Sequence, residues 1–395
     1  MRFSVLQQDL HRGLGIVNRA VPGRTTRPIL TNICVAAEGG RLRLFATDEE
    51  MGIVSWIPAT IHEEGATAIP AKLLCDFVGS LQPGQLEFTV TVGQNDAYAI
   101  RVRSQRGVAN IRGFDPTEFP LVPSAAGGEP PAQLEAATLK EMISAVIEAA
   151  GEDIQHPVFT GVLVQVRGQQ LTLVAADRQR LARRRDTLGI DAGDRPDILI
   201  PAQTLSDLIR ILPAQGKVAM AVTPRGSQVI FTTEQLQLSS RLIEGKFPDY
   251  TQILPKEHAT RAVIGTAALA SLVKEVWPFA EGNKHVVVLS LTGGAGESLD
   301  PGQLVLEATA QDLGDTTRYI SATVDGPDQR IIYDIRHLMD ALEVIKTPEI
   351  TIELTSEAKP GVIRPIGGVD FVTVITPFTR NAAQPAAPVE AAAAS

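Results

Sequence analysis

The chain has 395 residues and a formal net charge of −9, with 44% apolar and 21% charged residues. At about 100–200 residues per domain, this length predicts two to four domains of an ordinary soluble globular protein. No apolar run approaches the roughly 20 residues of a membrane-spanning helix, and the first residues lack the apolar core of a signal peptide. The acidic balance argues against indiscriminate attraction to nucleic acid, although a local basic surface remains compatible with it.

The first part of the chain predicts an α+β unit. A short strand precedes a helix over residues 8–20, in which Leu10, Leu14 and Val17 recur at helical spacing. Two alternating strands follow within residues 27–54. A second helix is predicted after Pro70, because the missing N–H of proline costs nothing at a helix start. Strands over residues 86–92 and 98–103 close a unit of two helices and mostly antiparallel strands.

The same order of elements occurs three times. Residues 27–54 match residues 156–183, which places Asp48 and Asp177 at equivalent positions 129 residues apart. IPAKLLCDFVGSL from Ile69 likewise matches IPAQTLSDLIRIL from Ile200. A more divergent third copy has helices over residues 266–279 and after Tyr333, with Asp312 in the place of Asp177. A period near 130 residues indicates a duplicated domain and not a solenoid.

We therefore predict three tandem domains over residues 1–126, 130–256 and 260–380. Clusters of proline, glycine and alanine mark the two linkers. Residues 381–395 are rich in alanine and proline without apolar periodicity, which predicts a disordered tail.

Signals for catalysis are weak in this sequence. The six histidines never fall at zinc-ligand spacing, and no glycine-rich stretch carries a full nucleotide-binding pattern. Asp48 and Asp177 are expected to cap turns by accepting backbone hydrogen bonds. Cys34 and Cys75 are expected to be small core residues in a reducing cytoplasm, with a disulfide as the alternative. We predict no catalytic site, no metal and no cofactor.

Several short motifs, together with the threefold layout, resemble the bacterial DNA sliding clamp, the β subunit of DNA polymerase III. They are MRF at Met1, RPIL at Arg27, ATDEEM at Ala46, IPAKLL at Ile69, AADRQRLA at Ala175, GKFPDY at Gly245 and TPFTR at Thr376. The resemblance covers roughly residues 1–380. It implies the DNA clamp fold and a head-to-tail homodimer, in which six domains form a ring with helices lining the hole. Such a cytoplasmic, non-catalytic processivity factor would hold a polymerase on DNA without base readout.

The partners implied by this resemblance are double-stranded DNA without sequence preference, a second copy of the chain, the replicative DNA polymerase and an ATP-dependent clamp loader. Other DNA polymerases and repair proteins that carry clamp-binding peptides are implied as well. Two alternatives stay open: a clamp-like paralogue without a replicative role, and a multidomain cytoplasmic enzyme. The enzyme would need a convergent acid and base cluster, which the sequence does not offer.

Basic and acidic residues balance across the six predicted helices, at eight of each, so the helices alone do not predict a basic channel. The resemblance makes Arg24, in the PGRTTRP loop, a DNA contact. Four further DNA-binding candidates are Arg27, Lys72, Arg178 and Arg210. The alternative for each is an ordinary solvated surface residue.

The resemblance also implies a hydrophobic cleft between the second and third domains that accepts short linear peptides. Its positions here are Phe159, Ala176, Arg180, Leu181, Pro248, Ile253, Val374, Pro377 and Phe378. Apolar walls with an arginine at the rim suit a peptide with aliphatic or aromatic anchors. Core packing is the alternative, and it is favoured for Val374 alone. The residues that depart from the family pattern, and so predict an altered peptide preference, are Arg178, Gln179, Gln252, His337 and Thr376.

Two residues match family positions that meet across the dimer interface. Ile111 lies in the strand after Gly107, and Phe279 ends the first helix of the third repeat. An apolar residue left exposed on a strand edge would otherwise invite aggregation. The alternative for both residues is packing within the core of their own domain.

Overall fold

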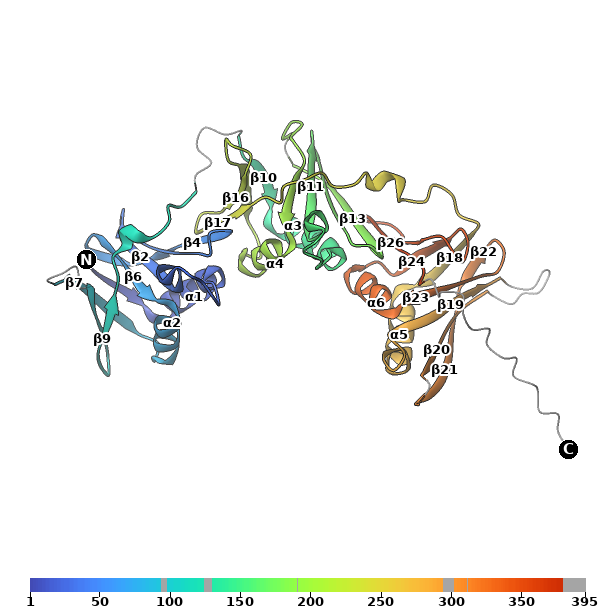
Figure 1. Cartoon of the computed structure of the whole chain (residues 1–395), viewed down its shortest axis with the longest axis horizontal. Helices are drawn as coiled ribbons and strands as arrows, with labels where there is room; N and C mark the ends of the chain where they lie inside the picture. Colours follow the sequence, from blue (N-terminus) through green and yellow to red (C-terminus); the bar gives the residue numbers. More distant parts are fainter. Residues whose placement is uncertain (94–97, 124–129, 190, 294–301, 311, 379–395) are drawn as a thin grey trace. The chain divides into compact units, whose positions relative to one another are not determined.

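A computed structural model describes residues 1–93, 98–123, 130–189, 191–293, 302–310 and 312–378 (Figure 1). The chain forms two compact units. The first contains Met1–Ala175 and Arg185–Phe247, and the second contains Ala176–Arg184 and the chain from Pro248 onward. The tail predicted at residues 381–395 lies outside the described residues.

The first repeat contains two α-helices and a set of short strands. In chain order they are β1 (Arg2–Leu6), α1 (Gln7–Val17), β2 (Asn32–Glu38), β3 (Arg41–Thr47), β4 (Met51–Pro58), β5 (Thr60–Glu63), β6 (Gly65–Pro70), α2 (Ala71–Ser80), β7 (Gln85–Val92), β8 (Tyr98–Ser104) and β9 (Gly107–Gly113). The predicted helix over residues 8–20 is confirmed, except that its last three residues form a 3-10 turn, η1 (Asn18–Ala20).

The second and third repeats follow the same order. The second contains β10 (Ala132–Glu135), α3 (Ala136–Val146), β11 (Gly161–Arg167), β12 (Gln170–Ala176), β13 (Arg180–Thr187), β14 (Ile198–Pro201), α4 (Ala202–Ile211), β15 (Lys217–Val222), β16 (Gln228–Thr232) and β17 (Leu236–Arg241). The third contains β18 (Thr260–Gly265), α5 (Thr266–Glu281), β19 (Val286–Thr292), β20 (Gln303–Ala310), β21 (Gly314–Ser321), β22 (Thr323–Asp325), β23 (Gln329–Asp334), α6 (Ile335–Val344), β24 (Glu349–Leu354), β25 (Gly361–Pro365) and β26 (Asp370–Ile375). The α+β class with three tandem repeats is confirmed.

Helix α1 shows why the repeats fold in this way. Leu10, Leu14 and Val17 are buried on one face of the helix and pack on the sheet. The helix comes so close to the sheet that a Cβ atom on Gly13 would lie 2.9 Å from the side chains of Leu44 and Ile57. Glycine at this position therefore permits the close contact between helix and sheet.

One continuous sheet joins the first two repeats within the first unit. Its strand order is β10-β15-β16-β17-β4-β3-β2-β6, and β17 pairs antiparallel with β4, with Leu238 opposite Ile53. On the helical side of this junction, an Arg19 guanidinium nitrogen lies 3.2 Å from Oδ1 of Asp207 on α4. The Asp207 side chain is only 8% exposed, which makes this ion pair less screened than a surface pair.

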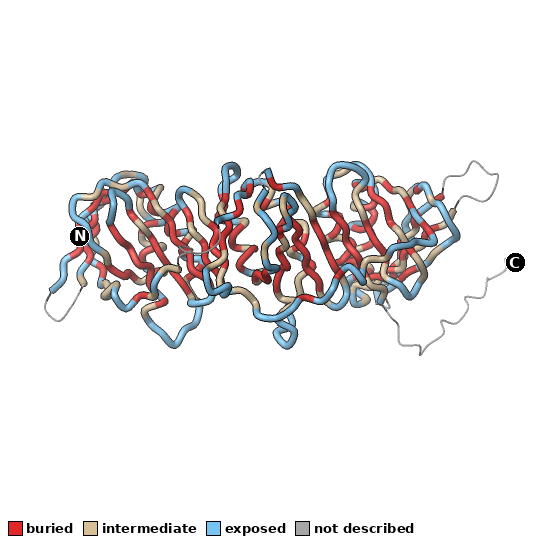
Figure 2. Tube along the Cα trace, turned by 90° about the horizontal axis from the view of Figure 1, so that it is seen from above, coloured by how far each residue is buried: buried red, intermediate tan, exposed pale blue. Residues whose placement is uncertain are grey.

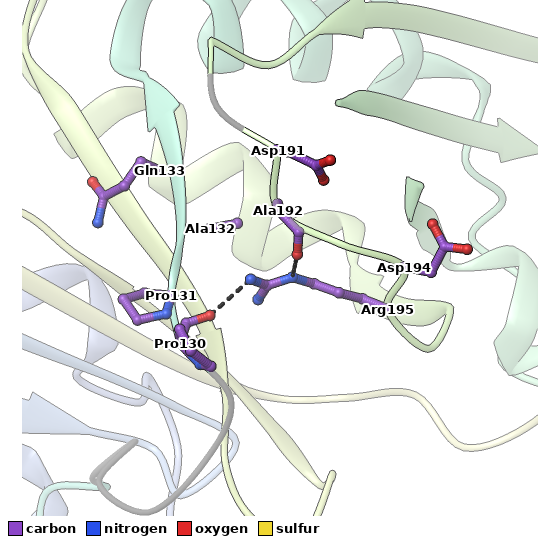
Figure 3. Close-up of a pocket in the computed structure, with 8 residues that line it drawn as sticks. All are labelled: Pro130, Pro131, Ala132, Gln133, Asp191, Ala192, Asp194 and Arg195. Atoms are coloured by element: carbon purple, nitrogen blue, oxygen red, sulfur yellow. Dashed lines mark hydrogen bonds between the residues drawn. The ribbon is translucent and has the colours of Figure 1, made fainter. Parts of the chain in front are cut away.

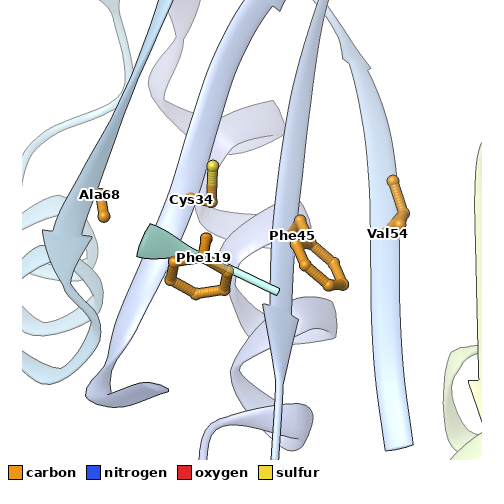
Figure 4. Close-up of a cluster of buried hydrophobic side chains, with 5 residues drawn as sticks. All are labelled: Cys34, Phe45, Val54, Ala68 and Phe119. Carbon is orange, nitrogen blue, oxygen red and sulfur yellow. The ribbon is translucent and has the colours of Figure 1, made fainter. Parts of the chain in front are cut away.

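The buried residues follow the strands (Figure 2). In the first repeat a second core lies on the face of the sheet away from α1, where Cys34, Phe45, Val54, Ala68 and Phe119 pack together (Figure 4). The rings of Phe45 and Phe119 meet edge to face with centroids 5.5 Å apart. Burial raises the pKa of the Cys34 thiol to about 11, and both cysteines are free. The core role predicted for Cys34 is confirmed, whereas Cys75 is only partly buried.

The second unit contains two further sets of paired strands. The order β13-β26-β25-β24-β18-β22 places the last strand of the third repeat beside the start of β13. A separate four-stranded sheet has the order β21-β20-β19-β23. Helices α5 and α6 pack against each other, and α5 also packs on β20 and β21.

Candidate functional site

The aspartates that follow the third strand of the first and second repeats cap turns, as predicted. Oδ1 of Asp48 accepts hydrogen bonds from the N–H groups of Glu50 and Met51 at 2.9 and 2.6 Å. Oδ1 of Asp177 accepts from the N–H groups of Gln179 and Arg180 at 2.6 and 2.8 Å. These carboxylates hold tight turns and are not paired as an acid and a base.

Arg180 is the centre of a charged network in the second unit. Its side chain is 16% exposed, its Nε donates to Oδ2 of Asp177 at 3.2 Å, and its NH1 donates to Asp340 on α6. The same helix carries His337, which is 8% exposed. Burial, followed by the Arg180 charge, lowers the pKa of His337, although Asp334, Asp177 and Asp340 oppose this effect. The arginine predicted for the rim of the cleft is thus held between two carboxylates.

We expect the stability of the second unit to fall as the pH decreases below the ordinary histidine pKa of 6.5. Above that pH the His337 imidazole is neutral in both the folded and the unfolded chain and contributes no pH dependence. Below it the unfolded chain binds the proton more readily than the folded chain, because the folded pKa is lowered, so folding loses free energy. Amide hydrogen exchange across α6 at pH 7.5 and 5.5 measures this loss.

The matched variants for this measurement are His337→Phe and His258→Gln, because His258 is exposed. His337→Phe should show a smaller loss of protection than the parent chain between the two pH values, and His258→Gln should behave like the parent. Equal pH dependence in the parent and in His337→Phe would exclude His337 as the titrating group.

The candidate DNA contacts are exposed in the structure, but they differ in their partners. Arg27 pairs with Glu49, and the Lys72 Nζ lies 3.3 Å from Oδ2 of Asp76, four residues along α2. Such exposed pairs contribute little, so a phosphate can replace the carboxylate. Within the described part of the chain, Arg24 and Arg210 make no ion pair. The first unit holds Arg24, Arg27, Lys72 and Arg210, and the second unit holds Arg178.

Eight of the nine residues predicted for the peptide cleft lie in the second unit, and Phe159 lies in the first. Three of the eight are core residues, namely Ala176, Leu181 and Val374, with exposed fractions of 3%, 2% and 1%. The core alternative thus holds for Val374 in this structure. Those that remain accessible are Arg180, Pro248, Ile253, Pro377 and Phe378. Phe159 packs edge to face on Phe247, with ring centroids 6.0 Å apart.

Hydrogen bonds from the last strand fix the accessible part of this residue set. The N–H and the hydroxyl of Thr376 both donate to the carbonyl of Gln179, each at 2.7 Å. The Phe378 N–H donates to the carbonyl of Ile332 at 2.8 Å. Thr376, which departs from the family pattern, therefore uses its hydroxyl to hold the chain on the turn that follows Asp177.

Sequence reasoning missed the partners of two arginines. Asp207 binds Arg19 and Asp340 binds Arg180, and both aspartates are the sixth residue of their helix, as is Asp76 on α2. The repeated aspartate in IPAKLLCD and IPAQTLSD was the available signal.

The two predicted dimer-interface residues differ in exposure. Ile111 is 7% exposed and packs within its own domain, whereas Phe279 is partly buried near the end of α5. On the same strand as Ile111, Val108 is 46% exposed, and sequence reasoning did not single it out.

Across the described ranges, no group of three or more His, Cys, Asp or Glu side chains is placed to hold a metal ion. In the same part of the chain, no helix is both long enough and apolar enough to cross a membrane.

Models of the three domains of one protein family match this chain in order. They describe the DNA polymerase III beta subunit: its N-terminal domain matches residues 1–123, its central domain residues 133–249 and its C-terminal domain residues 251–379. The chain belongs to the DNA polymerase III beta subunit family. This assignment confirms the resemblance found in the motifs and supports a DNA sliding clamp function.

Members of this family are similar along nearly the whole chain. The beta sliding clamp of a Synechocystis strain is 30% identical over 394 residues, covering 95% of this chain and 99% of that protein. The beta sliding clamp of Bacillus subtilis is 27% identical and covers the same shares. The crystal structure of the Bacillus subtilis sliding clamp matches this fold with a TM-score of 0.88 at 26% identity, over 96% of this chain and 99% of that one.

Proposed function

We propose that this chain is a replicative sliding clamp: a homodimeric ring that encircles duplex DNA and confers processivity on the replicative polymerase. It has no catalytic activity of its own and works in the cytoplasm. A clamp loader places it on DNA, and the loader, the polymerases and the repair proteins bind its peptide cleft. The domains are residues 1–126, 130–256 and 260–380. The match of all three family domains in order carries this proposal.

Two strand edges that have no partner in the described part of the chain support a head-to-tail ring. At the first junction the strand after the Asp48 turn, β4, pairs with β17, the last strand of the second repeat. At the second junction the strand after the Asp177 turn, β13, lies beside β26, the last strand of the third repeat. In the third repeat the strand at the position of β4 and β13 is β21, and in the first repeat the strand at the position of β17 and β26 is β9. Each is the end strand of its sheet. Pairing β21 of one copy with β9 of another repeats the same junction, and a heterologous contact of this kind forms a ring when the rotation between the copies closes.

The helices at the first junction indicate what meets at the proposed seam. Arg19 precedes the buried Ala20 and reaches Asp207 on α4. In the third repeat Phe279 precedes the buried Ala280 in the same way, and the counterpart of Asp207 is Asp76 on α2. Phe279 should therefore lie over α2 of a second copy, where Leu73 is 52% exposed. An aromatic ring on an exposed leucine would bury apolar surface that the single chain leaves in water.

The proposed DNA contacts are the exposed basic residues Arg24, Arg27, Lys72, Arg178 and Arg210. Because the ring would hold DNA by enclosing it, the net charge of −9 is compatible with the proposal. These side chains would contact phosphates and carry no sequence information. A strongly basic surface on the single chain is therefore not required for the ring to retain DNA.

The peptide cleft is supported by the accessible apolar residues of the second unit. Ile253 and Phe378 are 43% and 38% exposed, and Pro248 and Pro377 are accessible as well. The Arg180 guanidinium is already held by Asp177 and Asp340. The cleft is therefore suited to apolar anchors of a partner peptide rather than to a carboxylate directed at Arg180.

The proposal is tested on a nicked circular duplex loaded in the presence of the clamp loader, followed by gel filtration before and after the circle is cut. We expect the protein to stay with the circle and to leave after linearisation, because a ring slides off a free end. Binding that survives linearisation but falls steeply with salt would indicate an electrostatic grip instead. No retention with an active loader would favour the paralogue without a replicative role.

A further inference from the structure

The first strand of the second repeat is uncovered on one side. In the first repeat β1 lies between β5 and β7, and in the third repeat β18 lies between β22 and β24. Ser4 on β1 pairs with Thr60, and Val263 on β18 pairs with Thr323. The equivalent strand β10 pairs with β15 and ends its sheet, with no strand of the described residues on its other side.

The segment that should cover β10 is held elsewhere. The N–H groups of Leu188, Ala192 and Arg195 donate to carbonyls of the hairpin between β11 and β12, at 2.6, 3.1 and 3.1 Å. The acceptors are the carbonyls of Gln169, Gly168 and Val166. In the first repeat the segment after β4 forms β5, and in the third repeat the segment after β21 forms β22. The second repeat diverts this segment to the hairpin, which leaves the edge of β10 without a partner strand among the described residues.

The backbone groups of Gln133 and Glu135 point to this open side. The Ala136 N–H donates to the Gly216 carbonyl at 2.8 Å, which continues the ladder between β10 and β15. Because hydrogen-bonded pairs alternate along an antiparallel ladder, Ala132 and Leu134 bond to β15 and the residues between them face away from it. A row of backbone donors and acceptors on an exposed edge is a template for another strand.

Two cavities lie along this edge and share Gln133. One of about 390 Å³ lies between Pro130–Gln133 and the loop that carries Asp191, Asp194 and Arg195 (Figure 3). The other, of about 180 Å³, has a mixed lining, and its apolar members are Leu134, Leu139, Met142, Leu171 and Leu188. In Figure 3 the Arg195 guanidinium lies between the loop and the start of β10, and donates to the carbonyls of Pro130 at 2.7 Å and Ala192 at 3.1 Å.

The rim of these cavities is acidic. It carries four carboxylates and two cations, and one of the cations, Arg195, is bound to backbone carbonyls. The carboxylates belong to Glu135, Asp186, Asp191 and Asp194. Asp191 and Asp194 accept hydrogen bonds from the backbone N–H groups of Gly193 and Gly168, at 2.8 and 3.0 Å, which hold the two carboxylates in place.

We propose that the open edge of β10 binds an extended, basic peptide segment of a partner protein by strand addition. Backbone hydrogen bonds to Gln133 and Glu135 would supply affinity. Alternate apolar side chains would enter the leucine-lined cavity, and lysine or arginine side chains would face Asp191 and Asp194. Residues 381–395 of the chain itself contain no basic residue and include Pro385 and Pro388, so their charge and missing donors fit this edge poorly. This site is independent of the proposed ring and of its peptide cleft.

The test uses the full chain and a fluorescent hexapeptide of alternating lysine and valine, measured by anisotropy. We expect binding that weakens with salt, and at least roughly tenfold weaker binding when every peptide N–H is methylated, because two or more backbone hydrogen bonds are then lost. An alternating glutamate and valine peptide should not bind. Amide exchange at Gln133 and Glu135 should be fast in the free protein and slow with the lysine peptide. Equal binding of the methylated peptide, or unchanged exchange at these two amides, would overturn the proposal.

Matched variants locate the site. Gln133→Pro removes an outward donor without touching the ladder to β15 and should weaken binding roughly tenfold, whereas Gln133→Ala should bind normally. If the proline variant does not fold, the double variant Asp191→Asn with Asp194→Asn should bind several-fold more weakly, with a smaller salt dependence. Unchanged binding by these variants would overturn the proposal. Protection of both amides in the peptide-free protein, caused by self-association at this edge, would also overturn the proposal. Displacement of the hexapeptide by a peptide of residues 381–395 would overturn it as well.

Discussion

Replacing Gly361 by alanine should destabilise the second unit by about 3 kcal/mol or more, because the added methyl group has no space. A Cβ atom at Gly361 would lie 1.9 Å from the hydroxyl oxygen of Tyr333 and 2.7 Å from Cδ2 of Leu354. Both neighbours are fully buried, at 2% and 1% exposed, so neither can turn toward solvent. Chemical denaturation followed by hydrogen exchange in β24 and β25 measures the loss.

A double-mutant cycle separates this clash from a general effect of alanine. Tyr333→Phe alone should cost at most about 1 kcal/mol, because it removes only the hydroxyl that lies beside Gly361. In the Tyr333→Phe background the clashing oxygen is gone, and the nearest ring atom lies 3.3 Å from the new methyl group. Gly361→Ala should then cost at least about 1 kcal/mol less than in the parent chain.

The matched control for this cycle is Gly265→Ala in the same unit. Its Cβ atom would lie 3.8 Å from the nearest side chain, so its effect should stay within about 0.5 kcal/mol. A similar loss from Gly265→Ala and Gly361→Ala, or no recovery in the phenylalanine background, would contradict the steric explanation.

The sequence predicted the repeated helices and strands well because the local signals for each element agreed with its place in the repeat. Leu10, Leu14 and Val17 marked the buried face of α1, and Pro70 and Pro201 marked the residues just before α2 and α4. The turn function of Asp48 also followed from its place between two strands. These are contacts between residues close in sequence, so they could be inferred without knowledge of the fold.

Contacts between repeats could not be inferred in the same way. Arg19 and Asp207 are 188 residues apart, and Arg180 and Asp340 are 160 apart, so no local pattern links them. Burial at strand edges could not be predicted from the sequence either. Ile111 is buried inside its domain, whereas Val108 on the same strand is exposed. The path of the segment after β13 is set by the hairpin carbonyls that its N–H groups reach. An alternating sequence pattern does not encode these contacts.

Replacing Phe279 by aspartate should convert the proposed ring into single chains. At the first junction Arg19, which precedes a buried alanine as Phe279 does, lies against Asp207, so a similar geometry at the seam places residue 279 over Asp76 of a second copy. Phe279→Asp removes the aromatic contact with Leu73 and brings two carboxylates together. We expect dimer formation to weaken by about 100-fold or more, as a loss of about 3 kcal/mol implies. Analytical ultracentrifugation measures it, and retention on circular DNA should fall in parallel.

Phe279→Arg is the control that distinguishes this geometry from a general loss of apolar surface. Arginine at this position would recreate the Arg19–Asp207 pair across the seam, so this variant should dimerise at least about tenfold more tightly than Phe279→Asp. The advantage should disappear when Asp76→Ala is added, because the carboxylate acceptor is then absent. If both charged variants weaken the dimer equally, Phe279 does not face Asp76. If neither weakens it, Phe279 lies outside the seam and the pairing of β21 with β9 must be held by other residues.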